Sequence, residues 1–207
     1  MAKLTGYWET NLRTLVKQIG EEETKSILSD FSCPYNADIE DFLKHKAIVF
    51  SQQQLATTYL IFSSYKDQVV LVGYYALANK SVVIKGGDLN SKWRHRLNRY
   101  ATYDPNLKQY VVALPLIGQL SKNFKNGYDK LITGDQLLEA ACNQVRKIQS
   151  LISGNMVYLE CEDQPDLIEF YQRNAFFRFA NRNLDGDELE AGKTRYYVQM
   201  IRYFEKE

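Results

Sequence analysis

The stretch from Tyr110 to Cys161 constrains the fold of this chain more than any other. It begins with an apolar run, YVVALPLIGQL over 110–120, which predicts a strand covered on both faces. A polar loop over 121–132 leads into a periodic helix over 134–152, and NMVYLEC over 155–161 predicts a second strand. A strand, a helix and a strand in this order predict a parallel crossover, which needs a sheet with helices packed on it.

The flanking segments add antiparallel strands and further helices. Apolar residues at helical spacing predict an N-terminal helix that ends near Gly20 and an amphipathic helix after Asn36. Apolar runs predict strands over 26–29, 57–64, 69–78, 81–84, 176–181 and 196–201, with a hairpin turn at 66–68. The prediction is an α/β fold built on a single mixed, mostly antiparallel twisted sheet with flanking helices.

The charge balance argues against a general nucleic-acid-binding surface. Lys and Arg number 26 and Asp and Glu 25 in 207 residues, so a basic field over the whole protein is excluded and only a local patch remains. One basic cluster, Lys92, Arg94, His95, Arg96 and Arg99, surrounds Trp93. It could contact RNA or another anionic acceptor, but a solvated helix face is the more usual explanation.

Several other classes of site are disfavoured. No apolar run approaches the roughly 18 to 20 residues of a membrane helix, and Met1 to Thr5 lack the apolar core of a signal peptide. Three cysteines and two histidines are too scattered for a zinc site, so we expect no metal and a reducing cytoplasm. The acidic segment 185–188 is too short for an EF-hand and predicts a polar hairpin loop.

The start of the helix at Gly134 is the best candidate for an anion site. Thr133 and Gln136 fit a capping box, and the free N–H groups of a helix start favour an anion, with Lys130 close by. An ordinary, well-capped connection explains the same residues. The glycine patterns GxGxxG and GxxxxGK[ST] and the G-x-S-x-G elbow are all absent, which disfavours a common nucleotide-binding enzyme or a serine hydrolase.

The segment FYQRNAF over 170–176 adds a family resemblance. With the preceding strand, loop and helix, it resembles the GNAT superfamily of N-acetyltransferases, in which this stretch reads like FYxxxGF. The resemblance covers roughly residues 26–204. We assign residues 1–25 to an N-terminal helical extension and 26–207 to a GNAT-like acetyltransferase domain with an insertion at about 85–109.

The chain departs from two motifs of this family. Its R/Q-x-x-G-x-G/A loop is degenerate here, because Asp129, Ile132 and Gly134 occupy the equivalent places and only the last one matches. Ala175 stands where the second motif has glycine, and since Ala disfavours a positive φ we expect the turn to use another conformation.

The resemblance implies a cofactor, a reaction and its residues. It implies splayed central strands and acetyl-CoA as cosubstrate, with transfer of the acetyl group to a primary amine by direct attack. The pantetheine arm would lie against the end of the first central strand, and the diphosphate would lie at the helix start. The expected acetyl-CoA-binding residues are Leu120, Ser121, Lys122, Lys130, Leu131, Ile132, Thr133, Gly134 and Asp135.

Two side chains are predicted to take part in the chemistry. The resemblance assigns Tyr171 to stabilise the departing thiolate, although core packing also explains a tyrosine on the apolar side of its helix. Glu160 is the candidate general base, with an exposed carboxylate at a strand end as the alternative. Cys161 is expected to be a packing residue, because this chemistry needs no enzyme nucleophile.

The acceptor is left open at this stage. It is an amine-bearing small molecule or macromolecule. Nucleic acid is disfavoured by the charge balance, but a toxin-like aminoacyl-tRNA acetyltransferase is not excluded. A catalytically inactive GNAT-fold binding or regulatory module is the other alternative, and the protein could form a homodimer.

Overall fold

The computed structural model describes residues 6–184 and 196–205. The helices are α1 (Leu12–Ile19), α2 (Glu21–Ser29), α3 (Ala37–Asp41), α4 (Ala47–Gln52), α5 (Ser91–Leu97), α6 (Gly134–Ile152) and α7 (Pro165–Arg173), with a π-helical turn η1 (Phe42–Lys46) and 3-10 turns η2 (Gly86–Asp88) and η3 (Lys125–Lys130). The strands are β1 (Tyr7–Asn11), β2 (Thr57–Tyr65), β3 (Gln68–Lys85), β4 (Thr102–Asp104), β5 (Gln109–Lys122), β6 (Met156–Cys161), β7 (Phe177–Asn183) and β8 (Tyr196–Tyr203).

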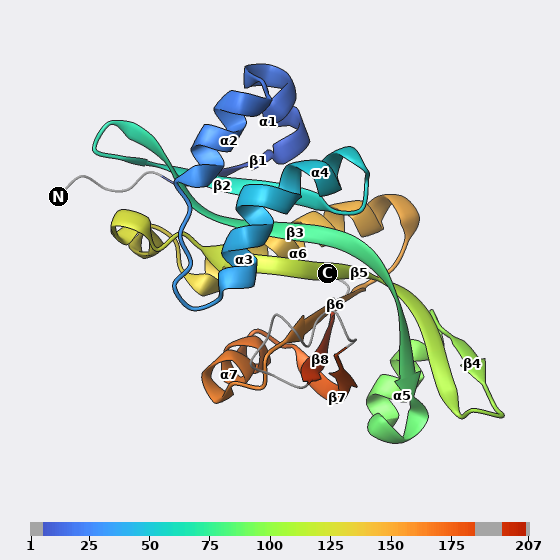
Figure 1. Ribbon diagram of the computed structural model, residues 1–207. Helices are drawn as coiled ribbons and strands as arrows, with labels where there is room; N and C mark the ends of the chain where they lie inside the picture. The colour runs from blue at the N-terminus through green and yellow to red at the C-terminus, as the bar shows by residue number, and fades with distance from the viewer. Residues whose placement is uncertain (1–5, 185–195, 206–207) are drawn as a thin grey trace. The chain divides into compact units, whose positions relative to one another are not determined.

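Within the described ranges the strands form one mostly antiparallel sheet, which confirms the predicted fold class (Figure 1). Its order is β1-β2-β3-β5-β6-β8-β7, and β4 pairs with β5. The chain divides into two compact units, one of residues 1–78 and 117–143 and the other of residues 79–116 and 144–207. The strands β3 and β5 and the helix α6 contribute residues to both units.

The first unit is built around the antiparallel strands β1, β2 and β3. Lys66 and Asp67 join β2 to β3 with φ values of 50° and 62°, which is a type I′ turn and confirms the predicted hairpin. One face of these strands packs against α1 to α4. The core there consists of Leu12, Leu28, Phe31, Cys33, Phe42, Leu43, Ala47, Ile48, Leu60, Phe62, Leu71, Tyr74 and Ala76.

Two local predictions in this unit are wrong. Residues 26–29 lie in α2, not in a strand, because acidic residues favour the first turn of a helix and Thr24 and Leu28 are buried one turn apart. Residues 7–11 form β1, so Trp8 belongs to a strand that pairs with β2 and stacks on Phe62, not to the N-terminal helix. The helix itself is limited to α1.

The amphipathic helix after Asn36 is confirmed, with an interruption. The Asn36 side chain accepts hydrogen bonds from the N–H groups of Asp38 and Ile39, at 2.9 and 3.3 Å, and so caps α3. The chain then passes through the π-helical turn η1 before α4.

The second unit contains the other strands together with α5 and α7. Strand β8 pairs antiparallel with β6 on one side and with β7 on the other. Helix α5 lies near the end of β3 and near β4 (Figure 1). Its core consists of Val82, Ile84, Leu89, Trp93, Leu97, Tyr110, Val112, Leu114, Met156, Tyr158, Phe179 and Ile201. Along β5, buried and exposed residues alternate from Tyr110 to Leu114, so the expectation of a strand covered on both faces is wrong for this half.

No helix among the described residues is both long and apolar enough to cross a membrane. The predictions made for Met1 to Thr5 and for the acidic loop at 185–188 lie outside the described residues.

Candidate functional site

The candidate anion site lies in the first unit, where β5 ends and α6 begins. The predicted capping box is confirmed: the Gln136 N–H donates to Thr133 Oγ1 at 3.1 Å, and the Thr133 N–H donates to Gln136 Oε1 at 2.9 Å. These two reciprocal hydrogen bonds fix the first turn of helix α6, which starts at Gly134.

The backbone donors of this segment are not all available to a ligand. The Leu131 N–H donates to the Tyr128 carbonyl at 3.0 Å, and the Thr133 N–H is used by the capping box. Among the predicted diphosphate donors, the proposed anion site therefore depends on the N–H groups of Ile132 and Gly134. They stand at the positive end of a 19-residue helix, so their position fits an anion.

The charged side chains of the segment have different surroundings. Lys122 donates to the Asp129 carbonyl at 3.1 Å, so its ammonium ties the end of β5 to the loop. Lys130 is exposed beside the helix start and supplies positive charge there. Asp135 lies in the first turn of α6, where its negative charge opposes that of an anionic ligand.

The two residues before Lys122 offer backbone rather than side-chain chemistry. Ser121 is buried, and its hydroxyl donates to the Lys122 carbonyl at 2.9 Å and lies 3.4 Å from Cys33 Sγ. Leu120 is half-buried. The polar groups that these residues can offer to an extended ligand are therefore their peptide N–H and C=O groups.

A buried asparagine fixes the position of this loop, and the sequence analysis missed it. Asn123 is fully buried. Its Nδ2 donates to the carbonyls of Leu71 and Asp30, at 2.8 and 3.1 Å, and its Oδ1 accepts from the N–H groups of Ser32 and Lys125, both at 3.0 Å. One side chain thus connects β3, the end of α2 and η3.

The backbone next to Asn123 approaches β3 closely. The Asn123 N–H donates to the carbonyl of Val72 at 2.8 Å, at a bulge where the register between β2 and β3 shifts. A Cβ atom on the neighbouring Gly73 would lie 2.9 Å from the Ser121 carbonyl oxygen and 3.4 Å from Lys122 Cα. Only glycine permits this approach, and a single glycine inside an apolar strand is the sequence signal that could have revealed it.

The second unit contains the candidate base, within a polar cluster. Glu160 lies on β6 with its side chain 12% exposed. Arg182 donates to both of its carboxylate oxygens at 2.9 to 3.0 Å, Lys80 donates to Oε1 at 3.1 Å and the Tyr158 hydroxyl donates to Oε1 at 2.5 Å. Gln199 in turn donates to the Tyr158 hydroxyl at 2.6 Å.

The partners of Glu160 set its protonation state. Burial raises the pKa of this carboxyl group, but the hydrogen bonds from Arg182 and Tyr158 and the charge of Lys80 outweigh it, so the pKa lies below its ordinary value of 4.5. Glu160 is therefore ionised at neutral pH. No local sequence signal pointed to Arg182 and Lys80, because they lie on other strands.

Tyr171, the other predicted catalytic residue, lies on α7 in the second unit. It is 7% exposed, and its ring packs edge-on against Phe170 and Phe176 at centroid distances of 5.0 and 5.7 Å. The ring therefore belongs to the packing of α7, and a role for its hydroxyl remains a prediction.

The turn after α7 contradicts one expectation. Ala175 has φ of +63°, so the turn keeps the left-handed conformation despite the missing glycine. The Ala175 N–H donates to the Gln172 carbonyl at 3.0 Å, and the Phe176 N–H donates to the Tyr171 carbonyl at 3.0 Å, which is the hydrogen-bond pattern of a Schellman motif. These bonds and the contact between Phe176 and Tyr171 hold an alanine where glycine is usual.

Cys161 has the properties of a packing residue. Its thiol is buried, 3.9 Å from Met200 Sδ, and burial raises its pKa to about 12, so it is protonated at neutral pH. The described part of the chain contains no group of three His, Cys, Asp or Glu side chains arranged to hold a metal ion.

No protein-family model and no curated protein sequence matches the chain. Solved structures match it over nearly the whole length. A mutant of KacT, in which a tyrosine is replaced by phenylalanine, superposes with a TM-score of 0.61 at 14% identity and covers 94% of each chain. A structure of AtaT complexed with acetyl-methionyl-tRNAfMet gives 0.58 at 14% identity, over 93% of this chain and 94% of that one. KacT and AtaT are GNAT-family proteins.

The chain has a GNAT-like fold. A third match, described as a bacterial toxin, gives a TM-score of 0.60 at 14% identity over 97% of this chain and 92% of that one. At this level of identity the matches establish the fold alone, so the chemistry has to be argued from the residues of this chain.

Proposed function

We propose that this GNAT-like protein is an acetyl-CoA-dependent N-acetyltransferase, which transfers an acetyl group to a primary amine by direct attack. The observation that carries the proposal is the segment from β5 to α6, in which a capped helix start with a cationic neighbour follows a strand of a GNAT-like sheet. A structure of AtaTR bound with AcCoA, at a TM-score of 0.52, supports the choice of cosubstrate.

Acetyl-CoA supplies an activated acetyl thioester when it is bound. The N–H groups of Ile132 and Gly134, with Lys130, would hold the diphosphate by charge-assisted hydrogen bonds. The peptide groups of Leu120 and Ser121 would hold the pantetheine arm. Leu131, Thr133 and Asp135 shape the helix start, and Lys122 fixes the loop to β5.

The catalytic assignments remain part of the proposal. The Tyr171 hydroxyl would donate a hydrogen bond to the sulfur of the leaving group. Full proton transfer is uphill, because reference pKa values are about 10 for Tyr and about 8.5 for a thiol. Glu160 would receive the amine proton through water. Its lowered pKa makes it a weak base, and its contribution is tested by replacing it with Gln.

The donor site can be tested by removing one N–H group. Gly134 is the first residue of α6, a position that accepts proline. Gly134→Pro therefore deletes this donor without breaking the helix, and Gly134→Ala keeps the donor as a matched control. In calorimetric titration with acetyl-CoA we expect Gly134→Pro to bind about tenfold more weakly, since a hydrogen bond to a charged group contributes about 1.5 kcal/mol or more.

Three outcomes would change the proposal. Equal affinity of Gly134→Pro and Gly134→Ala would remove the donor assignment. ATP binding as tightly as acetyl-CoA would favour a nucleotide-using enzyme. If acetyl-CoA does not bind at about millimolar concentration, where Kd corresponds to only about 4 kcal/mol, the inactive binding module would replace the transferase.

The Tyr171 assignment needs a kinetic readout. Tyr171→Phe keeps the packed ring and removes only the hydroxyl, so we expect turnover to fall about tenfold or more while acetyl-CoA affinity stays within about twofold. Unchanged turnover would leave the tyrosine as a packing residue.

A toxin-like aminoacyl-tRNA acetyltransferase is the second candidate function. It is favoured by the match to AtaT complexed with acetyl-methionyl-tRNAfMet, which covers 93% of this chain. Incubation with labelled acetyl-CoA and a panel of a polyamine, a peptide with a free amino terminus and methionyl-tRNA distinguishes the acceptors. Three buried cysteines without disulfide bonds fit a reducing compartment, so we place the reaction in the cytoplasm.

A further inference from the structure

Two aromatic side chains meet in the first unit, close to the proposed diphosphate site. Tyr65 is the last residue of β2, directly before the type I′ hairpin turn, and Tyr128 lies in η3, the turn that precedes α6. Their ring centroids are 5.9 Å apart and their planes are inclined by 72°, so the two rings form an aromatic corner. Both side chains are half-buried.

The backbone of the loop fixes the place of Tyr128 relative to the start of α6. Asn126 and Gly127 are both left-handed, with φ values of 52° and 75°, and make a tight turn just before Tyr128. The Leu131 N–H donates to the Tyr128 carbonyl at 3.0 Å, which closes one more turn. Ile132, the first of the two proposed diphosphate donors, follows directly. The aromatic corner is therefore one turn of chain away from the proposed anion site.

The two rings of the corner are not equally covered. Lys66 Nζ lies 5.1 Å from the centre of the Tyr65 ring, and the Tyr128 ring packs edge-on against Tyr65 as well. Among the described residues, no cation and no other aromatic ring packs on Tyr128. Since Tyr128 is only half-buried, its ring is the one that can accept a planar group, with Tyr65 as the second wall.

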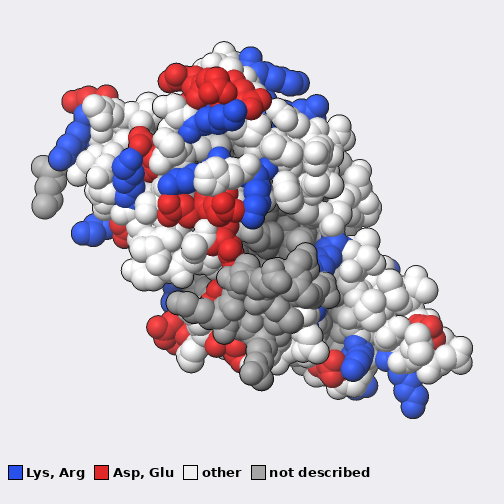
Figure 2. All heavy atoms as spheres, in the orientation of Figure 1, with Lys and Arg blue, Asp and Glu red and all other residues white. Residues whose placement is uncertain are grey.

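Two lysines without carboxylate partners flank the corner. Lys66 follows Tyr65, and Lys130 comes two residues after Tyr128; both are exposed, and neither forms an ion pair within the described ranges. Lys125, by contrast, pairs with an aspartate of the first unit. In Figure 2, basic side chains lie over the hairpin that joins β2 to β3 and over the loop before α6. Positive charge is thus available beside the rings.

We propose that the aromatic corner binds the adenosine 3′-phosphate end of acetyl-CoA. The inference rests on the proposed function: the adenosine is bonded to the diphosphate, and η3 directly precedes the N–H donors assigned to that diphosphate. The adenine would stack on Tyr128, since every base has a π-face that an aromatic ring can accept. Lys66 would face the 3′-phosphate. The protein would then select free acetyl-CoA over an acetyl group carried on phosphopantetheine alone.

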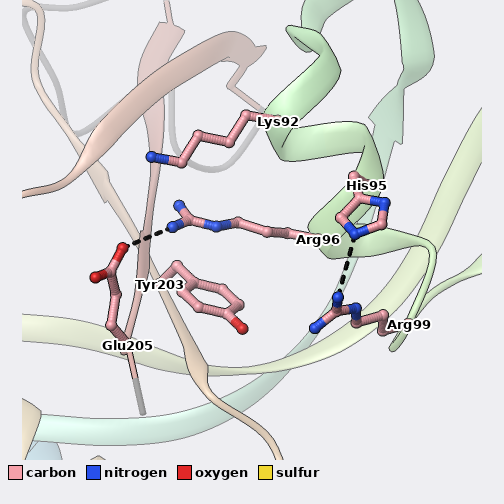
Figure 3. Close-up of a pocket in the computed structure, with 6 residues that line it drawn as sticks. All are labelled: Lys92, His95, Arg96, Arg99, Tyr203 and Glu205. Carbon is pink, nitrogen blue, oxygen red and sulfur yellow. Dashed lines mark hydrogen bonds and ion pairs between the residues drawn. The ribbon is translucent and has the colours of Figure 1, made fainter. Parts of the chain in front are cut away.

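The pocket drawn in Figure 3, in the second unit, does not offer the same chemistry. Its aromatic ring, Tyr203, is covered by the Arg96 guanidinium at 4.0 Å from the ring centre, and Arg96 donates to Glu205 at 3.0 Å. No ring of that lining is open to a base. Lys92 lines this pocket and is exposed, so it supplies a control lysine from the other unit (Figure 3).

Calorimetric titration of the full chain with acetyl-CoA and with S-acetyl-phosphopantetheine, which lacks the adenosine, tests the stacking. Tyr128→Ala should weaken acetyl-CoA binding about tenfold and leave acetyl-phosphopantetheine within about twofold, because only the coenzyme carries a base. Tyr128→Phe keeps the ring and should match the wild type with both compounds. Tyr100→Ala removes an exposed ring of the second unit and should change neither affinity by more than about twofold.

The 3′-phosphate is tested with acetyl-dephospho-CoA, which lacks it. At low ionic strength Lys66→Gln should weaken acetyl-CoA binding about fivefold and leave acetyl-dephospho-CoA unchanged, since one exposed cation contributes about that factor to a phosphate. Lys92→Gln, the charge-matched control, should stay within about twofold for both coenzymes. Equal losses for the two coenzymes in Lys66→Gln would overturn the assignment of the 3′-phosphate.

Two results would overturn the site while the proposed function stands. One is a Tyr128→Ala variant that binds acetyl-CoA as tightly as the wild type. The other is an equal loss for acetyl-CoA and acetyl-phosphopantetheine, because Tyr128 would then shape the loop instead of holding the adenosine. A wild-type protein that binds neither thioester would overturn the proposed function together with the site, so the two failures are distinguishable.

Discussion

Asn123 should contribute more to the stability of the first unit than any exposed residue of the same type. Asn123→Ala removes at once the two hydrogen bonds that Nδ2 donates and the two that Oδ1 accepts. Each is worth about 1 kcal/mol net, and the groups left behind at the part-buried positions can partly recover by binding water. We therefore expect the free energy of unfolding to fall by about 2 to 4 kcal/mol.

Urea denaturation measures this loss as a lower transition midpoint at unchanged slope. Asn123→Asp separates hydrogen bonding from volume, because it keeps the size and the Oδ1 acceptor but loses both donations. It should cost at least as much as Ala, since a carboxylate oxygen would face the carbonyls of Leu71 and Asp30. Asn98→Ala, at an exposed position directly after α5, should change stability by less than about 0.5 kcal/mol.

Asn123→Ala should also weaken acetyl-CoA binding, because Asn123 holds the loop that leads to α6. A loss below about 1 kcal/mol for Asn123→Ala, or a milder effect of Asn123→Asp than of Asn123→Ala, would refute the reasoning, because neither fits a side chain that satisfies several buried backbone groups.

The backbone and the charges of the chain support three more predictions. Ala175→Gly should raise the free energy of unfolding, measured by urea denaturation, by about 0.5 to 1 kcal/mol. The substitution removes the backbone strain of a left-handed alanine, and this gain exceeds the cost of the extra conformational entropy that glycine gives the unfolded chain. A destabilised variant would contradict this. Gly73→Ala should cost about 1 to 3 kcal/mol in the same assay, since its Cβ would lie 2.9 Å from a backbone oxygen, and wild-type stability would show that the strand can move away. The lowered pKa of Glu160 adds stability that is present above its ordinary value of 4.5 and is lost as the pH falls through the lowered pKa. The difference in unfolding free energy between wild type and Glu160→Gln should therefore be constant near neutral pH and shrink in acid. A difference that grew in acid would mean that folding raises the pKa of Glu160 instead of lowering it.

Local patterns in the sequence predicted most of the secondary structure. The capping box at Thr133 and Gln136 and the hairpin at Lys66 and Asp67 were confirmed because each depends on residues within three positions of one another. The strand predicted over 26–29 was wrong because four apolar or small residues fit either periodicity. Ala175 was misjudged because a Schellman motif with a packed Phe176 holds a conformation that alanine alone disfavours.

The sequence by itself determined the order of most elements, the GNAT-like sheet and the place where a helix start follows a central strand. The tertiary structure decided the surroundings of the polar residues. It brought Arg182 and Lys80 to Glu160 from other strands, and it set Asn123 between β3, α2 and η3. The reason is physical: periodicity and capping act over a few residues, whereas the protonation state and hydrogen bonding of a buried group depend on neighbours that only the folded sheet brings into contact.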